Sequence, residues 1–573
     1  MSSYASVEEF DFVIIGGGTA GCLIAKKLAS SPSKPSVAIF EAGEKHEGND
    51  LRLTYDRFSL PYTHPELDHG YKSVPQPQLA NRKIDMFCGK GFGGSSQINF
   101  QVWSLGAKEE FDSWAKSVDG PEWGFDSVLK TVKKLERAHA QVPAGWEKYS
   151  SLNPDAHGFS GQIDVTIGPN VEPELPHILN AGLEIGHQLN LDPNNGNPIG
   201  FSIGLSSTKG GLRTTSDSAF LSSGIPNLRL YSGTPISKII FEGKKAVGIE
   251  YEGNTVRAKK EVILAAGAIG TPHILLHSGV GPKHELESVG VKSVHDLPGV
   301  GKGLVDHPCV PVVYHMKHGF SERISFPSKE ENVTAAMGEL REFGTGPLTQ
   351  HMSSVGLAFL KTPDIEKLEH FSNLPPETRE LLLKPTCPHY EFAILGPLIP
   401  PEYQFKDSKD SYFTFFVTLM HPQSKGEVVL NSTNPSDPLM IDPKYSDAAY
   451  DRAIFKCAVR EALRWMEARP LKHFVKHAIA APASASDEDI ELQCKIHTKA
   501  TGMGLFHPSG TTKMGPASDH MACVDRDLKV HGLEGLRVSD LGVTPLLPSG
   551  HTQIVAYMIG YITADKIISQ WNL

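Results

Sequence analysis

Gly16-Gly17-Gly18-Thr19-Ala20-Gly21 is the stretch that decides the fold of this chain. Residues 11–15 before it form an unbroken apolar run that is typical of a buried parallel strand. Residues 22–28 after it have the apolar spacing of a helix, and residues 36–40 form a second apolar strand that ends on Glu41. A strand, a glycine turn, a helix, a second strand and a terminal acid in this order predict a Rossmann-like βαβ unit.

Each part of this unit suits the binding of a dinucleotide. Glycines permit a tight turn and let the backbone approach a pyrophosphate, while the helix N-terminus attracts its negative charge. Glu41 can accept hydrogen bonds from ribose hydroxyls, and its charge repels a 2′-phosphate. We therefore expect an ADP-containing cofactor to contact Glu41 and the glycine turn. The expected turn contacts are Gly16, Gly18, Thr19, Ala20 and Gly21.

The size and charge of the chain limit the classes of protein to which it can belong. Its 573 residues are too many for one core, so at least two domains are expected. A net charge of −10 argues against nucleic acid or an anionic membrane as a partner. No apolar run reaches the roughly 18 residues of a membrane helix. The N-terminus has no signal-peptide pattern, so a cytoplasmic location is expected.

The cysteines are scattered, odd in number and without CxxC spacing. They are Cys22, Cys88, Cys309, Cys387, Cys457, Cys494 and Cys523. This pattern fits reduced thiols better than a disulfide framework or a metal site, so we expect no metal.

The distribution of apolar segments predicts two domains that alternate along the chain. Glycine-punctuated apolar segments, typical of a nucleotide-binding domain, are predicted over residues 1–165, 205–312 and 500–573. A second, substrate-binding domain is predicted over 166–204 and 313–499, which contains a β-like run at 412–419 and a helical stretch at 447–467.

A second glycine-rich segment runs from Gly89 to Asn99. Its four glycines within six residues present backbone N–H groups of the kind that bind a phosphate or the polar edge of a ring system. Ser95, Ser96 and Asn99 add side-chain donors and acceptors. A flexible surface loop is the alternative interpretation, although such a loop has no need of the apolar run at 98–103 behind it.

Two histidines near the C-terminus are candidates for acid-base chemistry. His507 and His551 each lie in a Pro/Gly-rich turn, and the second precedes an apolar helix at 554–567. A single histidine is more often structural than catalytic, but two in such turns form a credible acid-base pair. Between them, residues 536–541 read as a strand that carries Asp540 at its end. A further strand at 262–264 precedes a helix in whose first turn Pro272 is expected.

Together these segments resemble the glucose-methanol-choline (GMC) oxidoreductase family. The resemblance rests on the glycine box at 89–99, the segment 267–281, the motif HPSGTTKMG at 507–515 and GHTQ at 550–553. Smaller similarities occur at 297–308, 422–428 and 437–445. The resemblance extends from residue 10 to about residue 568, nearly the whole chain.

This resemblance implies an α/β fold with an α+β insert. A Rossmann-like FAD-binding domain would be joined to a substrate domain with an antiparallel sheet and flanking helices. Some family members attach FAD covalently through a histidine just before the Asn of the glycine box. Gln97 and Ile98 stand there in this chain, so non-covalent FAD is expected. Beyond the fingerprint, the implied FAD contacts are Gly93, Gly94, Ser95, Asn99, Ile236, Asp540 and Gln553.

The resemblance also implies a reaction. His507 would take the proton of an alcohol while a hydride passes from the carbinol carbon to flavin N5, and His551 would hydrogen-bond the same oxygen. The substrate would be a small-molecule alcohol, most simply a primary one, and O2 or another acceptor would reoxidise the flavin. Aryl alcohols are one option, because several aromatic residues lie in the second domain, although most are expected in the sheet core. These are Phe320, Phe326, Phe405, Tyr412 and Phe415.

Three other classes of protein share parts of this pattern. A lyase or cyclase on the same FAD scaffold could use the histidine pair for acid-base work without hydride transfer. A non-enzymatic binding protein would have no need of both histidines. A nicotinamide dehydrogenase shares the fingerprint but lacks the glycine box. The oligomeric state stays open.

Overall fold

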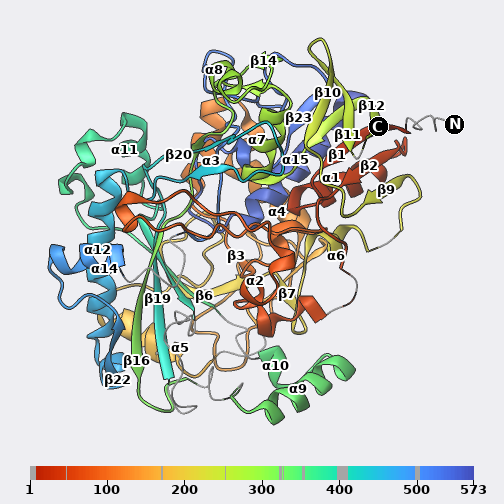
Figure 1. The fold of residues 1–573 in the computed structure, drawn as a ribbon. Coiled ribbons are helices and arrows are strands. Elements are labelled where there is room, and N and C mark those ends of the chain that lie inside the picture. Colours follow the sequence, from red (N-terminus) through yellow and green to blue (C-terminus); the bar gives the residue numbers. More distant parts are fainter. Residues whose placement is uncertain are drawn as a thin grey trace.

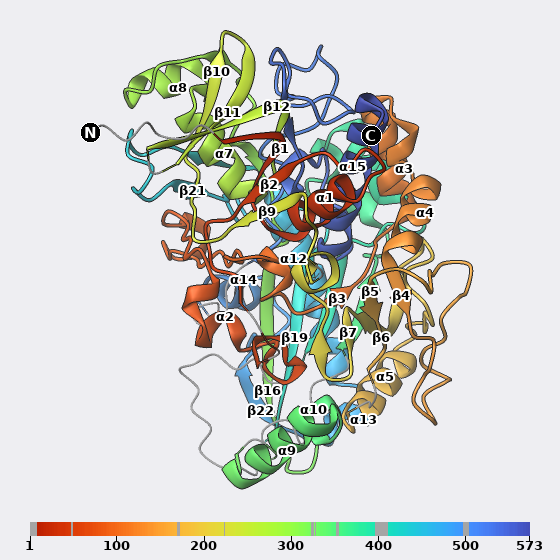
Figure 2. The same ribbon diagram turned by 90° about the vertical axis from the view of Figure 1, so that its right-hand side faces the viewer.

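A computed structural model describes residues 8–573 except 47, 49, 169–171, 223, 252, 322–325, 327, 351–354, 396–410 and 497–503. Two seven-stranded sheets form its framework, and Figures 1 and 2 show them from two directions. In both views helices α9 and α10 lie at the end of the molecule farthest from the first sheet. Among the described residues, no helix is both long enough and apolar enough to cross a membrane.

The first sheet is built around the predicted βαβ unit. Its strands are β1 (Glu8–Ile15), β2 (Val37–Phe40), β9 (Leu228–Tyr231), β10 (Lys238–Glu242), β11 (Lys245–Tyr251), β12 (Asn254–Leu264) and β23 (Leu536–Val538). β1 lies between β2 and β12 and is parallel to both, while β9 and β23 extend this parallel core. β10 and β11 add an antiparallel hairpin beside β12. Because parallel strands end at the same edge, the segments that follow β1, β2 and β12 meet there.

The second sheet is antiparallel throughout. Its strands, in spatial order, are β22 (Val475–Ala480), β16 (Cys309–Met316), β19 (Ser411–Leu419), β18 (Tyr390–Leu395), β17 (Val355–Leu360), β6 (Gly200–Ser206) and β3 (Val102–Trp103). β19 is buried along its whole length, which explains its continuous run of apolar and aromatic residues. Helix α12 (Ala449–Met466) covers part of this sheet, where Trp465 packs edge-on against Phe415.

Helices flank both sheets. The longer ones, besides α12, are α1 (Thr19–Ala29), α3 (Lys108–Val118), α4 (Phe125–Leu135), α5 (Leu175–Glu184), α7 (Gly267–His277), α9 (Glu330–Phe343), α11 (Pro376–Leu383), α14 (Asp487–Ile496) and α15 (Gln553–Trp571). Short helices are α2 (Leu60–Thr63), α6 (Ser216–Phe220), α8 (Lys283–Ser288), α10 (Pro347–Gln350) and α13 (Arg469–Lys472).

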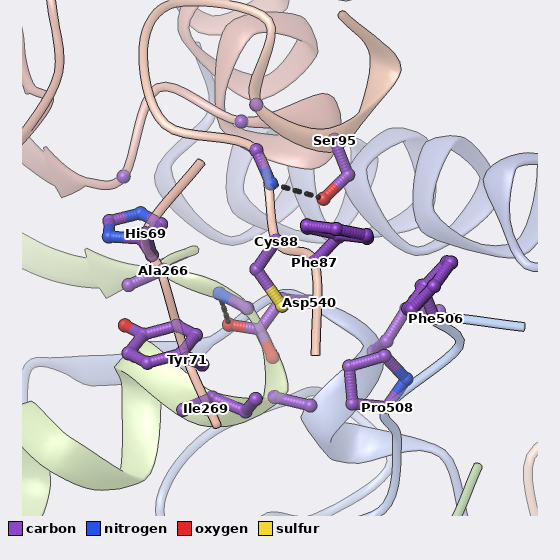
Figure 3. A pocket seen from close by; sticks show the side chains of 18 of the residues that line it. His69, Tyr71, Phe87, Cys88, Ser95, Ala266, Ile269, Phe506, Pro508 and Asp540 are labelled. Atoms are coloured by element: carbon purple, nitrogen blue, oxygen red, sulfur yellow. Dashed lines mark hydrogen bonds between the residues drawn. The ribbon is translucent and has the colours of Figure 1, made fainter. Parts of the chain in front are cut away.

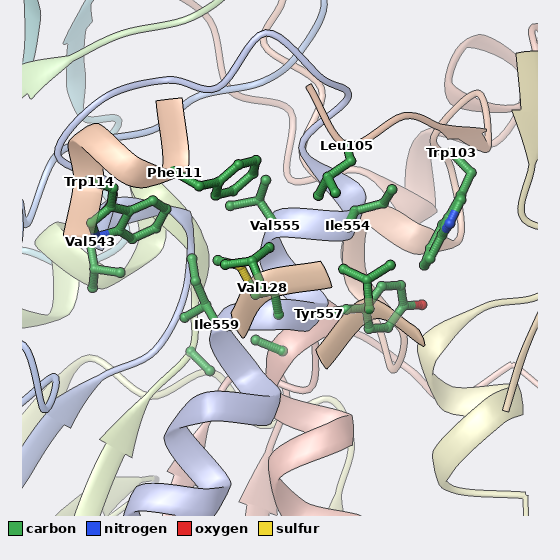
Figure 4. Packing of buried hydrophobic residues seen from close by; sticks show 14 of the residues in the cluster. Trp103, Leu105, Phe111, Trp114, Val128, Val543, Ile554, Val555, Tyr557 and Ile559 are labelled. Carbon is green, nitrogen blue, oxygen red and sulfur yellow. The ribbon is translucent and has the colours of Figure 1, made fainter. Parts of the chain in front are cut away.

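Helix α15 is at the centre of the core and carries Gln553 at its first turn. It lies against α1, where a Cβ on Gly560 would approach Ala20 to 3.0 Å, so only glycine permits this distance. Figure 4 shows Ile554, Val555 and Ile559 of α15 among the aromatic side chains of neighbouring segments. Burying each such side chain contributes roughly 1.5–3 kcal/mol to the free energy of unfolding, relative to leaving it exposed. This packing holds the turn before α15, which carries His551, in one position.

The predicted fold class is confirmed, and each predicted strand and helix is present. Two boundaries differ. The strand expected at 262–264 is the end of β12, which begins at Asn254. Helix α7 begins at Gly267, so Pro272 lies inside it and not in its first turn. A proline leaves the carbonyl four residues earlier without its helical donor. Here Thr511 Oγ1 donates to that Ala268 carbonyl at 2.6 Å. The division of the chain into two domains stays a prediction.

Candidate active site

A cavity of about 1110 Å³ extends from the carboxyl edge of the first sheet to the two C-terminal histidines. It exceeds the roughly 300–1,000 Å³ of most small-molecule pockets, so it has room for a large ligand and a second molecule. The predicted site residues that line it are Gly16, Gly18, Thr19, Ala20, Glu41, Gly94, Ser95, Asn99, Ile236, His507, Asp540, His551 and Gln553. Gly21 and Gly93 do not line it.

The two glycine segments pack backbone against backbone beneath the cavity. The Gly93 N–H donates to a carbonyl of the first segment at 2.7 Å, and a Cβ on Gly94 would lie 2.6 Å from Gly18 Cα. A Cβ on Gly21 would lie 2.0 Å from the Gly16 carbonyl oxygen. A Cβ on Gly18 meets nothing closer than 3.9 Å, so this position leaves space beside the backbone. Gly21 and Gly93 therefore act by packing, whereas Gly18 faces the space that suits a pyrophosphate.

The start of α1 completes this part of the site. Gly18 is the N-cap of α1 and offers no side-chain cap, while Thr19 and Ala20 line the cavity. The first N–H groups of a helix lack intrahelical partners and attract anions. An uncapped helix N-terminus beside an open backbone position fits the diphosphate of FAD.

Glu41 has a role that the sequence did not indicate. Its Oε2 accepts a hydrogen bond from the Gly17 N–H at 2.8 Å, and its Oε1 accepts from Gly43 at 2.8 Å and Gly91 at 2.9 Å. Burial raises the pKa of this carboxyl above its ordinary value. Glu41 thus joins the first glycine turn to the glycine box. It also lines the cavity, where a carboxylate with about four acceptor sites can still accept from a ribose hydroxyl.

Asp540 and Gln553 lie farther along the cavity. Asp540 Oδ2 accepts from the Gly267 N–H at 3.0 Å and from Thr271 Oγ1 at 2.5 Å, so the carboxylate joins β23 to the start of α7. Burial raises the pKa of Asp540 to about 6. Gln553 Oε1 accepts from Ser207 Oγ at 3.1 Å, whereas its buried Nε2 has no hydrogen-bond partner in the described part of the chain. A buried amide donor beside a cavity fits an acceptor on a ligand, such as a flavin carbonyl.

The side chains or neighbouring backbone of the remaining predicted FAD contacts already form hydrogen bonds within the protein. Ser95 Oγ accepts from the Gly89 N–H at 3.0 Å, an interaction drawn in Figure 3. Asn99 Oδ1 accepts from the Gln101 N–H at 3.0 Å. Ile236 is almost fully buried, and the same segment is tied to Glu41, whose carbonyl accepts from the Thr234 N–H at 2.8 Å.

His507 follows a residue in a rare backbone conformation. Phe506 has φ = 59°, in the left-handed region that aromatic residues seldom occupy. The turn is stabilised by Asp306, whose Oδ1 accepts from the His507 N–H at 2.8 Å and whose Oδ2 accepts from Tyr445 Oη at 2.5 Å. A strained turn held by a buried carboxylate is a feature of functional sites. Burial, and then the neighbouring His307 and His551, lower the pKa of His507 well below its ordinary value.

A third histidine determines which nitrogen of His507 carries hydrogen. His307 Nε2 lies 3.2 Å from the Met420 carbonyl, which can only accept, so this nitrogen is the N–H. Burial lowers the pKa of His307 well below its ordinary value, so the ring is neutral and its Nδ1 is an acceptor. That Nδ1 lies 3.0 Å from His507 Nδ1, which must therefore be the donor. His507 Nε2 is left with a free lone pair, as a general base requires.

His551 faces a different partner. Its Nε2 lies 3.0 Å from Oε1 of Glu391, a buried residue of β18. Its backbone N–H donates to the Ser104 carbonyl at 3.0 Å, and its ring centroid lies 5.2 Å from that of His507. A carboxylate that accepts a hydrogen bond from one ring nitrogen orients an imidazole and stabilises positive charge on it. One acceptor histidine and one carboxylate-supported histidine thus line the same cavity.

Sequence reasoning missed two of these partners. His307 lies in the segment 306–308, which was noted only as a smaller family similarity, and its pairing with His507 depends on the tertiary fold. Glu391 belongs to the second sheet and has no motif around it, so the sequence contained no signal for it.

Aromatic residues line the cavity beside His507. Figure 3 shows Phe87 and Phe506 side by side there, with ring centroids 4.9 Å apart. Phe100 lines the cavity as well. Four of the aromatic residues expected in the second domain do not line it: Phe320, Tyr412 and Phe415 are buried, and Phe326 packs in a peripheral cluster. The fifth, Phe405, lies outside the described residues.

Comparison with known proteins agrees with this geometry. Residues 10–309 match the N-terminal GMC oxidoreductase family model, and residues 422–560 match the C-terminal one. An uncharacterised GMC-type oxidoreductase of Mycobacterium bovis is 31% identical, with 98% of this chain and 99% of the relative covered. An oxygen-dependent choline dehydrogenase of Brucella anthropi is also 31% identical, over 99% of this chain and 96% of that protein.

A solved structure shows the same architecture. The FAD-dependent oxidoreductase from Chaetomium thermophilum superposes with a TM-score of 0.86 at 26% identity and covers 98% of this chain and 100% of its own. The family models together span more than half of the chain, and they include both the glycine turn and the two histidines. The chain therefore belongs to the GMC oxidoreductase family.

Proposed function

We propose that this enzyme oxidises a primary alcohol to the carbonyl compound, with FAD as its non-covalently bound cofactor. The observation that carries the proposal is the pair of different environments around His507 and His551. His507 is half-buried and neutral and presents a free Nε2 lone pair, while His551 is backed by the carboxylate of Glu391. Two neighbouring titratable groups whose surroundings favour different roles, one as a proton acceptor and one as a site for positive charge, are typical of an acid-base pair.

The residues of the chain divide the work around the alcohol oxygen. His507 Nε2 accepts the hydroxyl proton, and the His307 hydrogen bond keeps the ring in the tautomer that can do so. His551 stabilises the negative charge that develops on the oxygen, with Glu391 supporting its ring. FAD supplies the isoalloxazine ring that accepts the hydride from the carbinol carbon. Gly18, the start of α1, Glu41 and Gln553 bind and orient that cofactor.

The walls beside His507 favour a substrate with an apolar or aryl group next to its CH2OH. Phe87, Phe100 and Phe506 offer ring faces and edges there, and aromatic pairs of this kind gain about 0.5–1.5 kcal/mol beyond area burial. The Brucella relative carries the name of another primary alcohol, choline, which is consistent with alcohol chemistry on this scaffold. O2 or another acceptor completes the cycle as the oxidant, and the cytoplasm is the proposed location.

Anaerobic absorption spectra test this function. Purified protein with bound FAD is mixed with benzyl alcohol, cinnamyl alcohol, butanol and glucose in separate cuvettes. We expect the flavin bands to bleach with at least one of the aryl alcohols and less with the others. Bound flavin that no alcohol bleaches would favour the lyase or cyclase class, in which the histidines work without hydride transfer.

Removing the acceptor that His307 provides should release the tautomer of His507. His307→Leu should lower the rate of flavin reduction about tenfold, because a hydrogen bond of roughly 0.5–1.5 kcal/mol no longer fixes His507 Nδ1–H. His307→Asn keeps an acceptor near the position of Nδ1 and should restore most of the rate. Stopped-flow reduction over a range of pH measures both variants. Equal losses in the two variants, with an unchanged pH profile, would indicate a packing role only.

The three backbone contacts of Glu41 predict a loss of cofactor. Glu41→Ala should weaken FAD retention strongly, because it removes the ribose acceptor and also unties Gly17 and Gly91 from each other. Flavin content after gel filtration measures this effect. Glu285→Ala, a change at a partly exposed salt bridge to Lys302, serves as the control. Full retention in Glu41→Ala would contradict both roles.

A further inference from the structure

A second cluster of reactive side chains lies outside the cavity. Glu110 of α3, Cys387 just before β18 and His421 just after β19 come together from three segments that are far apart in the sequence. All three are buried: Glu110 and Cys387 are fully inaccessible to solvent, and His421 is 8% exposed. None of them lines the cavity of the proposed active site. An inaccessible Cys387 cannot meet a substrate, so a nucleophilic role for this cluster is excluded.

One potential ligand atom from each residue lies close to those of the other two. Cys387 Sγ lies 3.1 Å from His421 Nε2, and the same Nε2 lies 3.0 Å from Glu110 Oε1. The three atoms lie within 4.8 Å of one another. A tetrahedral Zn²⁺ with bonds of about 2.0–2.3 Å separates its ligand atoms by about 3.3–3.6 Å. The two separations that involve His421 Nε2 are a few tenths of an ångström shorter than this, and binding of an ion would require the three side chains to move apart slightly.

The hydrogen-bonding of this cluster is incomplete without a further partner. Glu110 Oε1 is buried, and its contact with His421 Nε2 at 3.0 Å is an ion-pair distance without hydrogen-bond geometry. A ring nitrogen carries either one hydrogen or one lone pair, so His421 Nε2 cannot satisfy a thiol and a carboxylate at once. A buried carboxylate oxygen that is left without a hydrogen bond is costly, and a bound metal ion would remove this cost.

We propose that Glu110, Cys387 and His421 bind a thiophilic divalent cation such as Zn²⁺. Thiolate, imidazole and carboxylate are the three ligand types that zinc takes in proteins. A thiolate and a carboxylate together neutralise the double charge of the ion, so the filled site is electrically balanced in its buried surroundings. Three protein ligands leave one position of the tetrahedron for a water molecule.

The surroundings hold the ligands in place before any ion binds. Glu110 Oε2 accepts from the Ala107 N–H at 3.1 Å and from the Ser549 N–H at 2.9 Å, which leaves Oε1 to face the cluster. The loop of Cys387 is fastened by Lys361, whose ammonium donates to three carbonyls, those of Leu382, Lys384 and Cys387. In metal sites, hydrogen bonds from surrounding residues typically hold the ligand side chains in the orientation that the metal needs.

The cation would connect the cluster to the segments that position His507 and His551. Ser549, bound by Glu110, lies two residues before His551. His421 follows Met420, whose carbonyl sets the tautomer of His307. An ion that joins Glu110 to His421 therefore stabilises the two segments that position the acid-base pair, without touching the substrate.

Cobalt substitution of the FAD-bound enzyme tests the proposal. Co²⁺ in a tetrahedral site with a thiolate ligand gives absorption bands at longer wavelengths than flavin. We expect wild-type enzyme incubated with Co²⁺ and then desalted to show these bands. Cys523→Ala, which removes another buried cysteine that is not part of the cluster, should show them equally, and Cys387→Ala should not. Absence of the bands from wild-type enzyme, or equal bands in Cys387→Ala, would overturn the proposal.

Metal analysis provides the second measurement. Enzyme reconstituted with Zn²⁺ and desalted against a weak chelator should retain one equivalent more zinc than Cys387→Ala treated in the same way. FAD content and the thermal unfolding curve show whether the variant is folded. If Cys387→Ala does not fold, the zinc and cobalt results for wild type and Cys523→Ala decide alone, and wild-type enzyme that retains no ion refutes the site.

Discussion

His507→Ala should leave FAD bound and lower the rate of flavin reduction by roughly 10²–10⁴, the usual contribution of a positioned general base. This factor corresponds to about 2.7–5.5 kcal/mol of activation free energy. The variant removes a cavity-lining ring nitrogen whose lone pair is left free when His507 Nδ1 donates to His307. His507 contacts the fold through its backbone and through His307, so FAD binding on the other side of the cavity should persist.

Stopped-flow reduction under anaerobic conditions measures this rate directly. The pH dependence provides a second readout. A base must be unprotonated, so activity is lost as pH falls through its pKa. Because burial lowers the pKa of His507, the wild-type rate should stay constant down to a pH below the ordinary histidine value of 6.5. A rate that is near normal in His507→Ala would remove this residue from the role of base.

His551→Ala should lower the reduction rate by roughly 10²–10³, the usual effect of removing one donor to a developing oxyanion. Glu391→Gln offers a matched test, because glutamine preserves the shape of the side chain and the contact with His551 Nε2 but removes the negative charge. We expect Glu391→Gln to reduce the rate less than His551→Ala and to leave the affinity for the alcohol almost unchanged. Flavin content and stopped-flow traces for both variants check this order.

The two histidine roles can be distinguished by these variants. If His551→Ala costs more than His507→Ala and the negative charge of Glu391 proves essential, then His551 with Glu391 is the base. The tautomer derived from His307 would then describe a structural contact only.

The sequence predicted the parts of the fold that depend on local pattern. The apolar run before Gly16, the strand that ends on Glu41 and the helix that follows His551 each appear where periodicity places them. These elements are decided by neighbours within one strand or helix, which a single sequence reports well. The start of α7 was misplaced because Thr511, more than 200 residues away, supplies the hydrogen bond that Pro272 cannot.

The sequence predicted those site residues that lie in a recognisable motif. It did not predict those that reach the site from distant segments of the chain. Gly18, His507 and His551 lie in turns with recognisable composition. The tautomer of His307 is set by the Met420 carbonyl, which lies on another segment. Nothing in the sequence distinguishes Glu391, the partner of His551, from the other acidic residues. Cys387 gave no signal either, because its partners come from α3 and from the end of β19. Such contacts depend on how the strands, helices and loops pack in three dimensions. The local pattern of residues along the chain does not determine that packing.

The reduction of bound FAD by a single alcohol, followed anaerobically with protonated and α,α-dideuterated substrate, tests the central claim most directly. Benzyl alcohol is the first substrate to use. We expect the flavin bands to bleach in one turnover and deuterium on the carbinol carbon to slow the bleaching severalfold, since that C–H bond breaks in the step observed. Flavin that stays oxidised with every alcohol tested, in protein that has retained its FAD, would contradict alcohol oxidation as the function of this enzyme.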